Sequence, residues 1–466
     1  MKLKIENFKS LTNEKFDLNR VNILIGENSA GKSSLLKFFL LLKQSLKGSS
    51  SSSSFNLTLK GERFDFGNFK DIISFNQVEK KIVFEIEFLN YHEFFVDFFG
   101  QYFQNMQQKY PQTVEDFINL TSNNKVTLKC EIDSNLKNHE GSIVTISSDY
   151  LGEITLKSRV KDNVVFQDDY CNLTLVKSGV TTEYKSLEFD REAFLKYIKR
   201  EGLMAAIKDE KKLTDEKDIV KELLPFAFLL ISQNYLESVL NKIEYINPID
   251  SNPKRYFFFE AASDKSSKID LESIVNVLND DDIITSDIRD PLMNTLNEAL
   301  AYLGIADEIK FDSSDNIPVI ELKAKIYDFW SNITDVGYGL SLQLPVLFRT
   351  IIAGLVSEKR LIFIEQPEVH LHPQLQAKFI ETIIKYGGNS TFYIETHSEH
   401  IIRKLQSLVK HKNYGLTKDD VSIYYFKREK KGSVISKHLI EENGKLSRNF
   451  PSGFFDTSYL LAKELL

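Results

Sequence analysis

The residues best suited to chemistry lie near the start of the chain, where Gly26 and Gly31 belong to the pattern G-x-x-x-x-G-K-S. Glycines at this spacing let backbone N–H groups surround phosphate oxygens, while Lys32 supplies a charge to the β/γ-phosphates and Ser33 a hydroxyl to Mg²⁺. A chance glycine turn is the alternative, but an apolar strand precedes the pattern and an apolar helix follows it, as a phosphate loop requires. The predicted phosphate-binding residues are Gly26, Asn28, Ser29, Ala30, Gly31, Lys32, Ser33 and Ser34.

A buried strand predicted at 361–364 ends in Glu365 and Gln366. An acidic residue at the end of a strand is the second requirement of a phosphate-loop nucleotidase, because it holds Mg²⁺ directly or through water. We assign this role to Glu365. An ordinary core strand with charged residues at its exit is the alternative.

A third apolar run, at 392–394, ends in Glu395-Thr396-His397-Ser398. The His397 ring can hydrogen-bond a γ-phosphate or an attacking water. A lone histidine at a strand end is usually structural, and it is the pairing with two other strand-end motifs that favours a functional role.

A glycine-rich segment ahead of these strands opens a further predicted helix, with Gly339 and Ser341 at its start. The N–H groups at a helix N-terminus form an anion site. Such a site, separate from the phosphate loop, makes sense if it closes over a nucleotide bound by another subunit. A plain glycine turn capped by Ser341 is the alternative.

The elements around these motifs are of two kinds. Helical periodicity is expected at about 90–125 and 190–245. Within the second stretch, the charged residues at 208–222 form a solvated helix face or, as the alternative, a partner-binding surface. The serine run 49–54 is expected to be a flexible loop. A helix is predicted at 291–303 and a strand at 319–326. An antiparallel sheet is predicted from short alternating segments at 125–131, 142–147, 152–157, 164–167 and 172–176.

The composition predicts a cytoplasmic protein of two or three lobes. At 466 residues the chain is too long for one compact core, and its formal net charge of -7 gives no global positive field for nucleic acid. Cys130 and Cys171 lack metal-site spacing and fit a reducing compartment. We expect no signal peptide, because the chain begins with an alternating strand at 1–5. We expect no membrane partner, because the most apolar run, 223–231, is about half the length of a bilayer span.

The four motif blocks, in this order, resemble the ABC-type ATPase heads of the SMC, RecF and OLD group. G-E-N-S-A-G-K-S resembles Walker A, G-Y-G-L-S the signature, I-F-I-E-Q-P-E-V-H-L-H-P Walker B with the D-loop, and E-T-H-S the histidine switch. The opening L-K-I-E-N-F-K-S-L is similar to the first strand of this group. The tail N-F-P-S-G-F-F-D resembles a bacterial subfamily without a fused nuclease, whose architecture is similar to anti-phage ATPases such as those of the PARIS (AriA) and Septu (PtuA) systems.

The resemblance implies an α/β fold, an ABC-type P-loop ATPase head at 1–90 and 319–466, split by a large α+β insertion at 91–318. It implies ATP and Mg²⁺ as cofactors and a homodimer or a higher oligomer of dimers, because each active site needs a signature loop from another copy. The implied catalytic residues are Lys32, Glu365, Gln366 and His397; the implied metal ligands are Ser33 and Glu365; and the nucleotide contacts from the second copy are Gly339 and Ser341.

Two departures from the family pattern bear on activity. The signature lacks the glycine pair that usually follows the serine, and Glu365-Gln366 stands where Walker B usually has Asp-Glu. A glutamine cannot accept a proton, and general-base transfer contributes ~10²–10⁴ in rate. Our hypothesis is slow hydrolysis, with ATP holding two heads together; if turnover is fast, Glu368 or Glu365 is the base.

Two further patterns have simple explanations. Glu368, His370 and His372 offer a carboxylate and H-x-H, which the resemblance assigns to the loop after Walker B; a metal site is the alternative. The basic run 427–431 lies between two predicted strands and indicates a hairpin turn, with phosphate-backbone contact as the alternative.

The function that we favour from the sequence is an ATP-dependent sensor and scaffold of a bacterial anti-phage defence system. It would hold and regulate a separately encoded effector, a nuclease, with DNA or a phage protein as trigger. The alternative is a DNA repair or chromosome-maintenance ATPase that clamps DNA; a transporter motor is disfavoured because the insertion splits the head. The chain is not expected to cleave nucleic acid itself, because the short segment after His397 lacks a spaced Asp-x-Asp with a partner glutamate.

Overall fold

The computed structural model divides the chain into two compact units, each assembled from two stretches of sequence. Unit 1 comprises Met1–Asp17 and Lys37–Asn241, and unit 2 comprises Leu18–Leu36 and Lys242–Leu466. The head and insertion boundaries expected from the sequence remain a prediction. The structure describes residues 1–47, 57–61, 64–88, 126–133, 140–148, 152–159, 169–177, 180–189, 235–246, 253–258, 271–279, 285–314, 317–356, 359–451, 454–455 and 463–464.

Unit 1 contains an eight-stranded antiparallel sheet, whose strands in spatial order are β2 (Leu11–Asp17), β1 (Lys2–Phe8), β4 (Ile82–Phe88), β5 (Val126–Ile132), β6 (Glu140–Ser148), β7 (Gly152–Arg159), β8 (Asp169–Lys177) and β9 (Val180–Phe189). Every second residue of β4 and β5 is buried, as a sheet with one covered face requires. The predicted antiparallel sheet is confirmed, while the strand predicted at 164–167 lies outside the described residues.

Strand β2 is not predicted by the sequence pattern. Only Leu11 and Phe16 of this strand are buried, and the four residues between them are polar. The strand therefore lacks the clear alternation of apolar and polar residues that predicts a strand with one buried face. The strand forms by pairing with β1 from Lys2↔Asp17 onward. The short helices α2 (Phe69–Ile72) and η1 (Ser74–Asn76) also belong to this unit.

Helix α1 (Lys32–Lys47) begins in unit 2 and continues in unit 1 from Lys37. The Phe38 ring meets the rings of Phe8 in β1 and Phe84 in β4 edge-on, with centroid distances of 5.3 and 5.5 Å. Such aromatic pairs add to the stabilisation from buried area. The later turns of the helix are therefore fixed to the antiparallel sheet.

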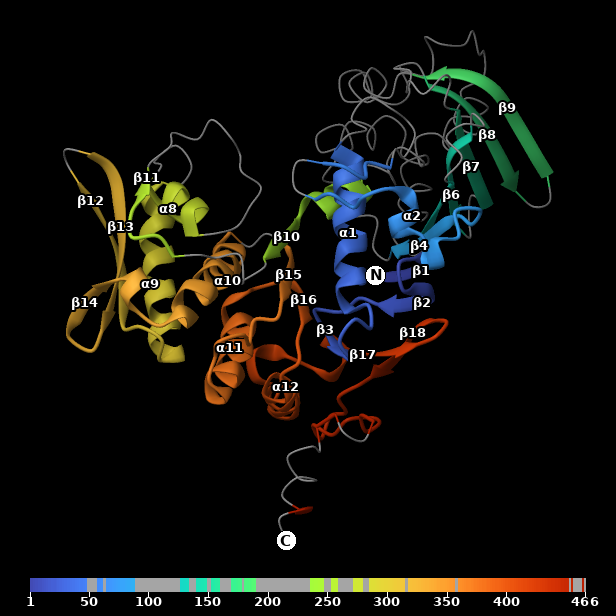
Figure 1. Ribbon diagram of the computed structural model, residues 1–466. Coiled ribbons are helices and arrows are strands. Elements are labelled where there is room, and N and C mark those ends of the chain that lie inside the picture. The colour runs from blue at the N-terminus through green and yellow to red at the C-terminus, as the bar shows by residue number, and fades with distance from the viewer. Residues whose placement is uncertain are drawn as a thin grey trace, which may run out of the picture. The chain divides into compact units, whose positions relative to one another are not determined.

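Unit 2 is organised around a six-stranded sheet, whose strands in spatial order are β10 (Ile243–Ile246), β15 (Leu361–Glu365), β16 (Thr391–Glu395), β3 (Val21–Gly26), β17 (Val421–Glu429) and β18 (Gly432–His438). The first five are parallel, and β18 runs antiparallel to β17 (Figure 1). All six residues of β3 are buried, as expected for a central parallel strand. Because parallel strands end at one edge, the polar residues after β3, β15 and β16 meet there.

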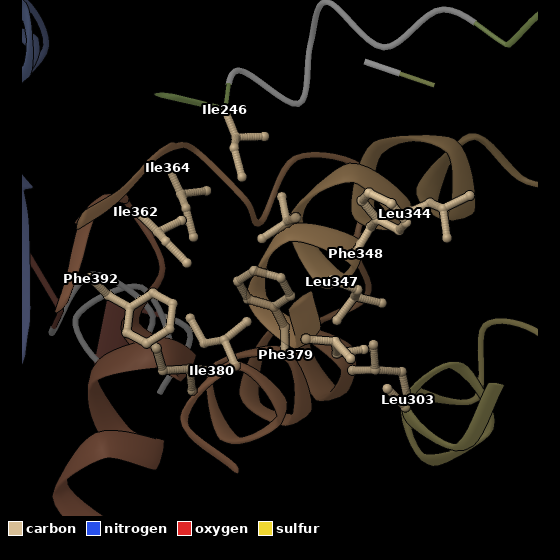
Figure 2. Close-up of a cluster of buried hydrophobic side chains, with 14 of the residues drawn as sticks. Ile246, Leu303, Leu344, Leu347, Phe348, Ile362, Ile364, Phe379, Ile380 and Phe392 are labelled. Carbon is tan, nitrogen blue, oxygen red and sulfur yellow. The ribbon is translucent and has the colours of Figure 1, made fainter. Parts of the chain in front are cut away.

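The helices of unit 2 are α8 (Leu271–Asn279), α9 (Ser286–Leu303), α10 (Tyr338–Leu355), α11 (Pro373–Tyr386) and α12 (Glu399–His411), with short turns at η4 (Ile333–Asp335), η5 (Asn413–Gly415) and η6 (Lys418–Asp420). Side chains of α9, α10, α11 and the sheet share one apolar core, which includes Phe348, Ile364 and Phe379 (Figure 2). A smaller sheet in the same unit contains β11 (Phe257–Phe258), β13 (Ile317–Ile326), β12 (Glu308–Ser314) and β14 (Phe329–Asn332).

Two helices of unit 2 differ from what a sequence pattern suggests. Helix α9 begins at Ser286, before the predicted start at Pro291, which lies inside the helix. Of the helices that the structure describes, α10 is long and apolar enough to cross a membrane, yet 67% of it is buried inside the protein. Its place in the apolar core accounts for that composition.

Several predicted segments lie outside the described residues. They are the serine loop at 49–54, the helical stretch at 90–125, the charged face at 208–222, and residues 190–234 of the helical stretch predicted at 190–245. Of the rest of that stretch, 235–241 is helical as predicted, whereas Ile243–Ile246 is strand β10.

Candidate functional site

The loop between β3 and α1 has the backbone conformation that its glycines predict. The φ angles of Gly26 and Gly31 are +144° and +91°, and Ser29 between them is also left-handed at +57°. A Cβ added to Gly26 would lie 2.1 Å from the carbonyl oxygen of Phe426, so β17 leaves no room for a side chain there. Asn28 and Ser29 at the tip are exposed, and the loop therefore presents its backbone to solvent.

Lys32 folds back over this loop. Its Nζ donates hydrogen bonds to the carbonyl oxygens of Gly26 at 3.2 Å and Glu27 at 2.8 Å. Burial lowers the pKa of Lys32, while the nearby carboxylates of Glu395 and Glu368 act in the opposite direction. The ammonium group is thus held at the mouth of the loop, where it can pair with phosphate charge.

The hairpin of β17 and β18 supports the phosphate loop. The Glu27 carboxylate accepts a hydrogen bond from the backbone N–H of Arg428 at 3.0 Å, and the Ser433 hydroxyl donates to the carbonyl oxygen of Ala30. The hairpin turn predicted for 427–431 is confirmed. Its contact with a loop about four hundred residues earlier has no signal in the sequence, because strand neighbours in a parallel sheet are not consecutive.

Ser33 contacts a carboxylate that sequence reasoning missed. Its hydroxyl donates to Glu395 Oε2 at 2.7 Å. Glu395 ends β16 and pairs in register with Glu365 at the end of β15, so both carboxylates lie at the same edge of the sheet. The available signal was the position of Glu395 in Glu-Thr-His-Ser, directly after an apolar strand.

Gln366 begins the loop after β15 in a left-handed conformation, with φ of +47°. This backbone is uncommon for a residue with a side chain and costs of order 1–3 kcal/mol. It is held by a hydrogen bond from the Gln366 N–H to the carbonyl oxygen of Glu395 at 2.7 Å, and by one from the Val369 N–H to the Gln366 carbonyl at 3.2 Å. Surrounding structure therefore imposes the path of this loop.

Glu368 follows two residues later and faces the third motif. Its Oε1 accepts a hydrogen bond from the backbone N–H of His397 at 2.6 Å, and its Oε2 is enclosed without a hydrogen-bond partner among the described residues. Burial raises the pKa of Glu368. Burial also lowers the pKa of His397, and the charge of Lys32 adds to this effect. The three side chains therefore share one electrostatic environment.

Two glutamines, the buried Gln343 and the partly buried Gln376, fix the loop after β15 to its neighbours. Gln343 of α10 donates to the carbonyl oxygen of Pro367 at 2.7 Å. Gln376 of α11 donates to the carbonyl oxygen of Leu371 at 2.9 Å and accepts from the Ser398 hydroxyl at 2.6 Å. Movement of α10 or of the segment before α12 would therefore shift the loop after β15 through these hydrogen bonds.

The start of α10 exposes different residues from those predicted to act. Gly337 is the N-cap and Tyr338 is 40% exposed, whereas Ser341 is 0% exposed and its hydroxyl has no hydrogen-bond partner among the described residues. Gly339 is partly covered, because a Cβ there would lie 3.4 Å from Leu371 Cδ2. In this conformation Ser341 does not reach a ligand outside the chain, and the role expected for it stays a prediction.

The H-x-H pattern has other partners. The His370 ring lies edge-on to Tyr338 with centroids 5.5 Å apart, and His372 caps the N-terminus of α11 by accepting from the Gln374 N–H. Within the part of the chain that the structure describes, no group of three or more His, Cys, Asp and Glu side chains could hold a metal ion.

The residues at the sheet edge fit a magnesium nucleotide. The Ser33 hydroxyl and the Glu395 carboxylate are in contact, and Glu365 ends the next strand in the same register. Hydroxyl and carboxylate oxygens are the donors that Mg²⁺ prefers, usually with water and substrate phosphates completing its shell. Ser33, Glu365 and Glu395 are therefore the residues that could hold the ion.

Comparisons with known proteins agree with this arrangement. A family model described as an AAA ATPase domain matches residues 1–402. A second model, described as a protein of unknown function, matches residues 416–464, which include the hairpin that supports the phosphate loop. No curated protein matches the chain.

Similar solved structures are heads of SMC proteins. An SMC head bound to the C-winged helix domain of ScpA has 13% sequence identity and a TM-score of 0.42, over 94% of this chain and 97% of that chain. An Smc head with an extended coiled coil, bound to the C-terminal domain of ScpA and derived from Pyrococcus furiosus, has 12% identity and a TM-score of 0.41, over 100% and 98%. The SMC head domain from Thermotoga maritima has 10% identity and a TM-score of 0.34, over 94% and 97%.

Proposed function

Since the chain belongs to the AAA ATPase domain family, we propose that it hydrolyses ATP slowly at the phosphate loop and uses bound ATP to hold two copies together. The predicted α/β fold of an ABC-type P-loop ATPase is confirmed by the family match and by the strand order around β3. The chain is accordingly an ATP-binding ATPase. The rate, the assembly and the biological role belong to the proposal.

Gln366 is the residue that carries the proposed slow rate. It stands at the exit of β15 between Glu365 and the loop that leads to Glu368. Its amide cannot accept a proton from water, so the position directly after Glu365 cannot supply the ~10²–10⁴ in rate that a well-placed general base contributes. Binding does not need this proton transfer, so the chain should bind ATP even though it hydrolyses it slowly.

Phosphate handling is assigned to Lys32, Ser33 and the loop amides. Lys32 would exchange its two carbonyl partners for phosphate oxygens when nucleotide binds. Ser33 and Glu365 would hold Mg²⁺, with Glu395 beside them, and the ion would neutralise charge on the β- and γ-phosphates.

Association of two copies is proposed through the start of α10. Gly337 and Tyr338 are exposed there, and the helix start offers N–H groups to an anion. Contact between Ser341 and the second nucleotide would require the first turn of α10 to shift. The link from Gln343 to Pro367 would transmit that shift to the loop after β15.

For the biological role, we propose a cytoplasmic sensor and scaffold in anti-phage defence that regulates a separate effector nuclease and does not cleave nucleic acid itself. Its support is the resemblance of the tail to a bacterial subfamily without a fused nuclease, whose architecture is similar to that of anti-phage ATPases. Stoichiometric co-purification with the product of the adjacent gene would support this role. Duplex DNA binding that strengthens with ATP and weakens steeply with salt would support a DNA clamp instead.

Turnover and assembly test the biochemical proposal together. We expect steady-state hydrolysis well below about 1 s⁻¹, the low end of ordinary enzymes, and a shift from monomer to dimer on adding Mg-ATP, measured by light scattering. The Lys32→Ala variant should show neither. Turnover at or above that level, or assembly that ignores ATP, would contradict the proposal.

A further inference from the structure

We infer that Glu368, rather than Gln366, is the group that accepts the proton of the attacking water. The inference rests on the proposed ATPase site and adds a catalytic residue to it. Glu368 lies one residue beyond Pro367, outside the strand-end pair Glu365-Gln366 in which the base of this family is usually sought. It assigns the residual hydrolysis of this chain to a named side chain.

The geometry sets Glu368 apart from the other carboxylates of the edge. One oxygen is fixed by the His397 N–H at 2.6 Å, which orients the carboxylate. The carboxylate also feels the Thr396 hydroxyl and its own backbone N–H, which favour its charged form, but its other oxygen, Oε2, is enclosed and has no partner at hydrogen-bond geometry among the described residues. An enclosed carboxylate oxygen without a partner is costly unless a ligand or water completes it. A water held there for attack on phosphate would supply that partner.

The surroundings place the Glu368 carboxylate close enough to Lys32 for the two charges to interact. Glu368 acts on the charge of Lys32, the residue that would bind the terminal phosphates, and His397 also senses that charge. Burial raises the pKa of Glu368, which makes its carboxylate a better proton acceptor near neutral pH.

The other acidic residues have competing tasks. Glu395 accepts the Ser33 hydroxyl, and Glu365 lies beside it in register, so both suit the metal side of the site. Gln366 carries an amide, which can orient water through a hydrogen bond but cannot take its proton. Glu368 is therefore the carboxylate left for the water.

Hydrolysis through Glu368 consumes one water and yields ADP and inorganic phosphate. The water oxygen forms a bond to the terminal phosphorus as its proton passes to Glu368 Oε2. The bond from that phosphorus to the bridging oxygen breaks, and ADP leaves with inorganic phosphate. Glu368 then returns the proton to solvent.

The test compares Glu368→Gln with the wild-type full chain. A glutamine keeps an oxygen that can accept from the His397 N–H, so the loop should retain its fold. We expect kcat to fall by about tenfold or more, at or below the lower end of what general-base transfer contributes, while the Kd for a fluorescent ATP analogue stays within about threefold. Glu298→Gln, at an exposed position of α9, should keep the wild-type rate.

Two reference variants separate the roles of the carboxylates. Glu365→Gln should raise the Mg²⁺ concentration needed for half-maximal rate, whereas Glu368→Gln should lower kcat at saturating Mg²⁺. Gln366→Glu should increase turnover by supplying a second base.

A Glu368→Gln chain that hydrolyses ATP at the wild-type rate, while Lys32→Ala does not, would overturn this inference and leave the proposed function standing. A wild-type chain without Lys32-dependent hydrolysis would overturn both. Loss of ATP binding in Glu368→Gln would also overturn the inference, because the residue would then serve binding rather than proton transfer.

Discussion

The phosphate loop and the start of α10 are two glycine-rich helix starts of unit 2 that differ in what they expose. At the phosphate loop the tip residues Asn28 and Ser29 reach solvent, and Lys32 already lies over the backbone that would surround phosphate. At α10 only the glycines and Tyr338 reach the surface, while Ser341 is enclosed.

This difference shows that only one half of the proposed composite site, the phosphate loop, has its ligand-binding groups accessible in this conformation. The loop is braced by β17 and β18 within one chain, and nucleotide can bind without a rearrangement of the fold. The serine of α10 can act only after the helix start moves. Mutations at each region should therefore separate binding from assembly.

The largest effect is expected for Lys32→Ala. The variant loses charge-assisted hydrogen bonds to phosphate worth about 1.5–3 kcal/mol each, which corresponds to roughly 10- to 150-fold in affinity. Equilibrium binding of a fluorescent ATP analogue measures the loss. Lys37→Ala, an exposed position one turn later in α1, is the matched control and should bind as wild type. Equal ATP affinity of the two variants would contradict the assignment of this loop as the phosphate-binding loop.

A glycine pair compares the two regions directly. Gly26→Ala places a Cβ 2.1 Å from the Phe426 carbonyl at a φ of +144°, whereas Gly337→Ala meets no atom within 4 Å. Overpacking and backbone strain should cost Gly26→Ala about 1–3 kcal/mol or more of unfolding free energy, together with ATP binding. Gly337→Ala should leave both unchanged. Urea denaturation with and without Mg-ATP measures the stability of both variants and its increase on ATP binding. Equal unfolding midpoints of the two variants would contradict the prediction.

A smaller effect is expected when the brace of the loop is weakened. Ser433→Ala removes the hydrogen bond to the Ala30 carbonyl and should cost about 0.5–1.5 kcal/mol. The unfolding midpoint in urea reports the loss, and ATP affinity should fall by a few-fold because the loop is less well held. Full affinity together with full stability would show that the hairpin does not support the loop.

The smallest effect on stability is expected for Ser341→Ala. Its hydroxyl is enclosed and has no partner in the described structure, so its removal should leave the unfolding free energy unchanged or raise it by up to about 1 kcal/mol. ATP-dependent dimerisation is the second readout, and it should weaken if α10 shifts as proposed. A clear loss of stability would mean that the hydroxyl has a structural partner.

The sequence predicts the local parts of this site well. The strand, loop and helix around Lys32 and the strand ending at Glu365 follow from apolar runs and glycine spacing, which are local signals. The side-by-side arrangement of β16 and β3, which brings Glu395 onto Ser33, depends on strand order and has no local signal. The hydrogen bond from Ser433 to the Ala30 carbonyl also depends on strand order and has no local signal. The burial of Ser341 depends on how α10 packs in the core.

The most direct measurement is ATP binding and ATP turnover on one preparation of the full chain. We predict about one Mg-ATP bound per chain, lost in Lys32→Ala, with hydrolysis well below about 1 s⁻¹. Binding that survives the Lys32→Ala substitution, or turnover at the rate of ordinary P-loop enzymes, would contradict a phosphate loop that binds ATP and hydrolyses it slowly.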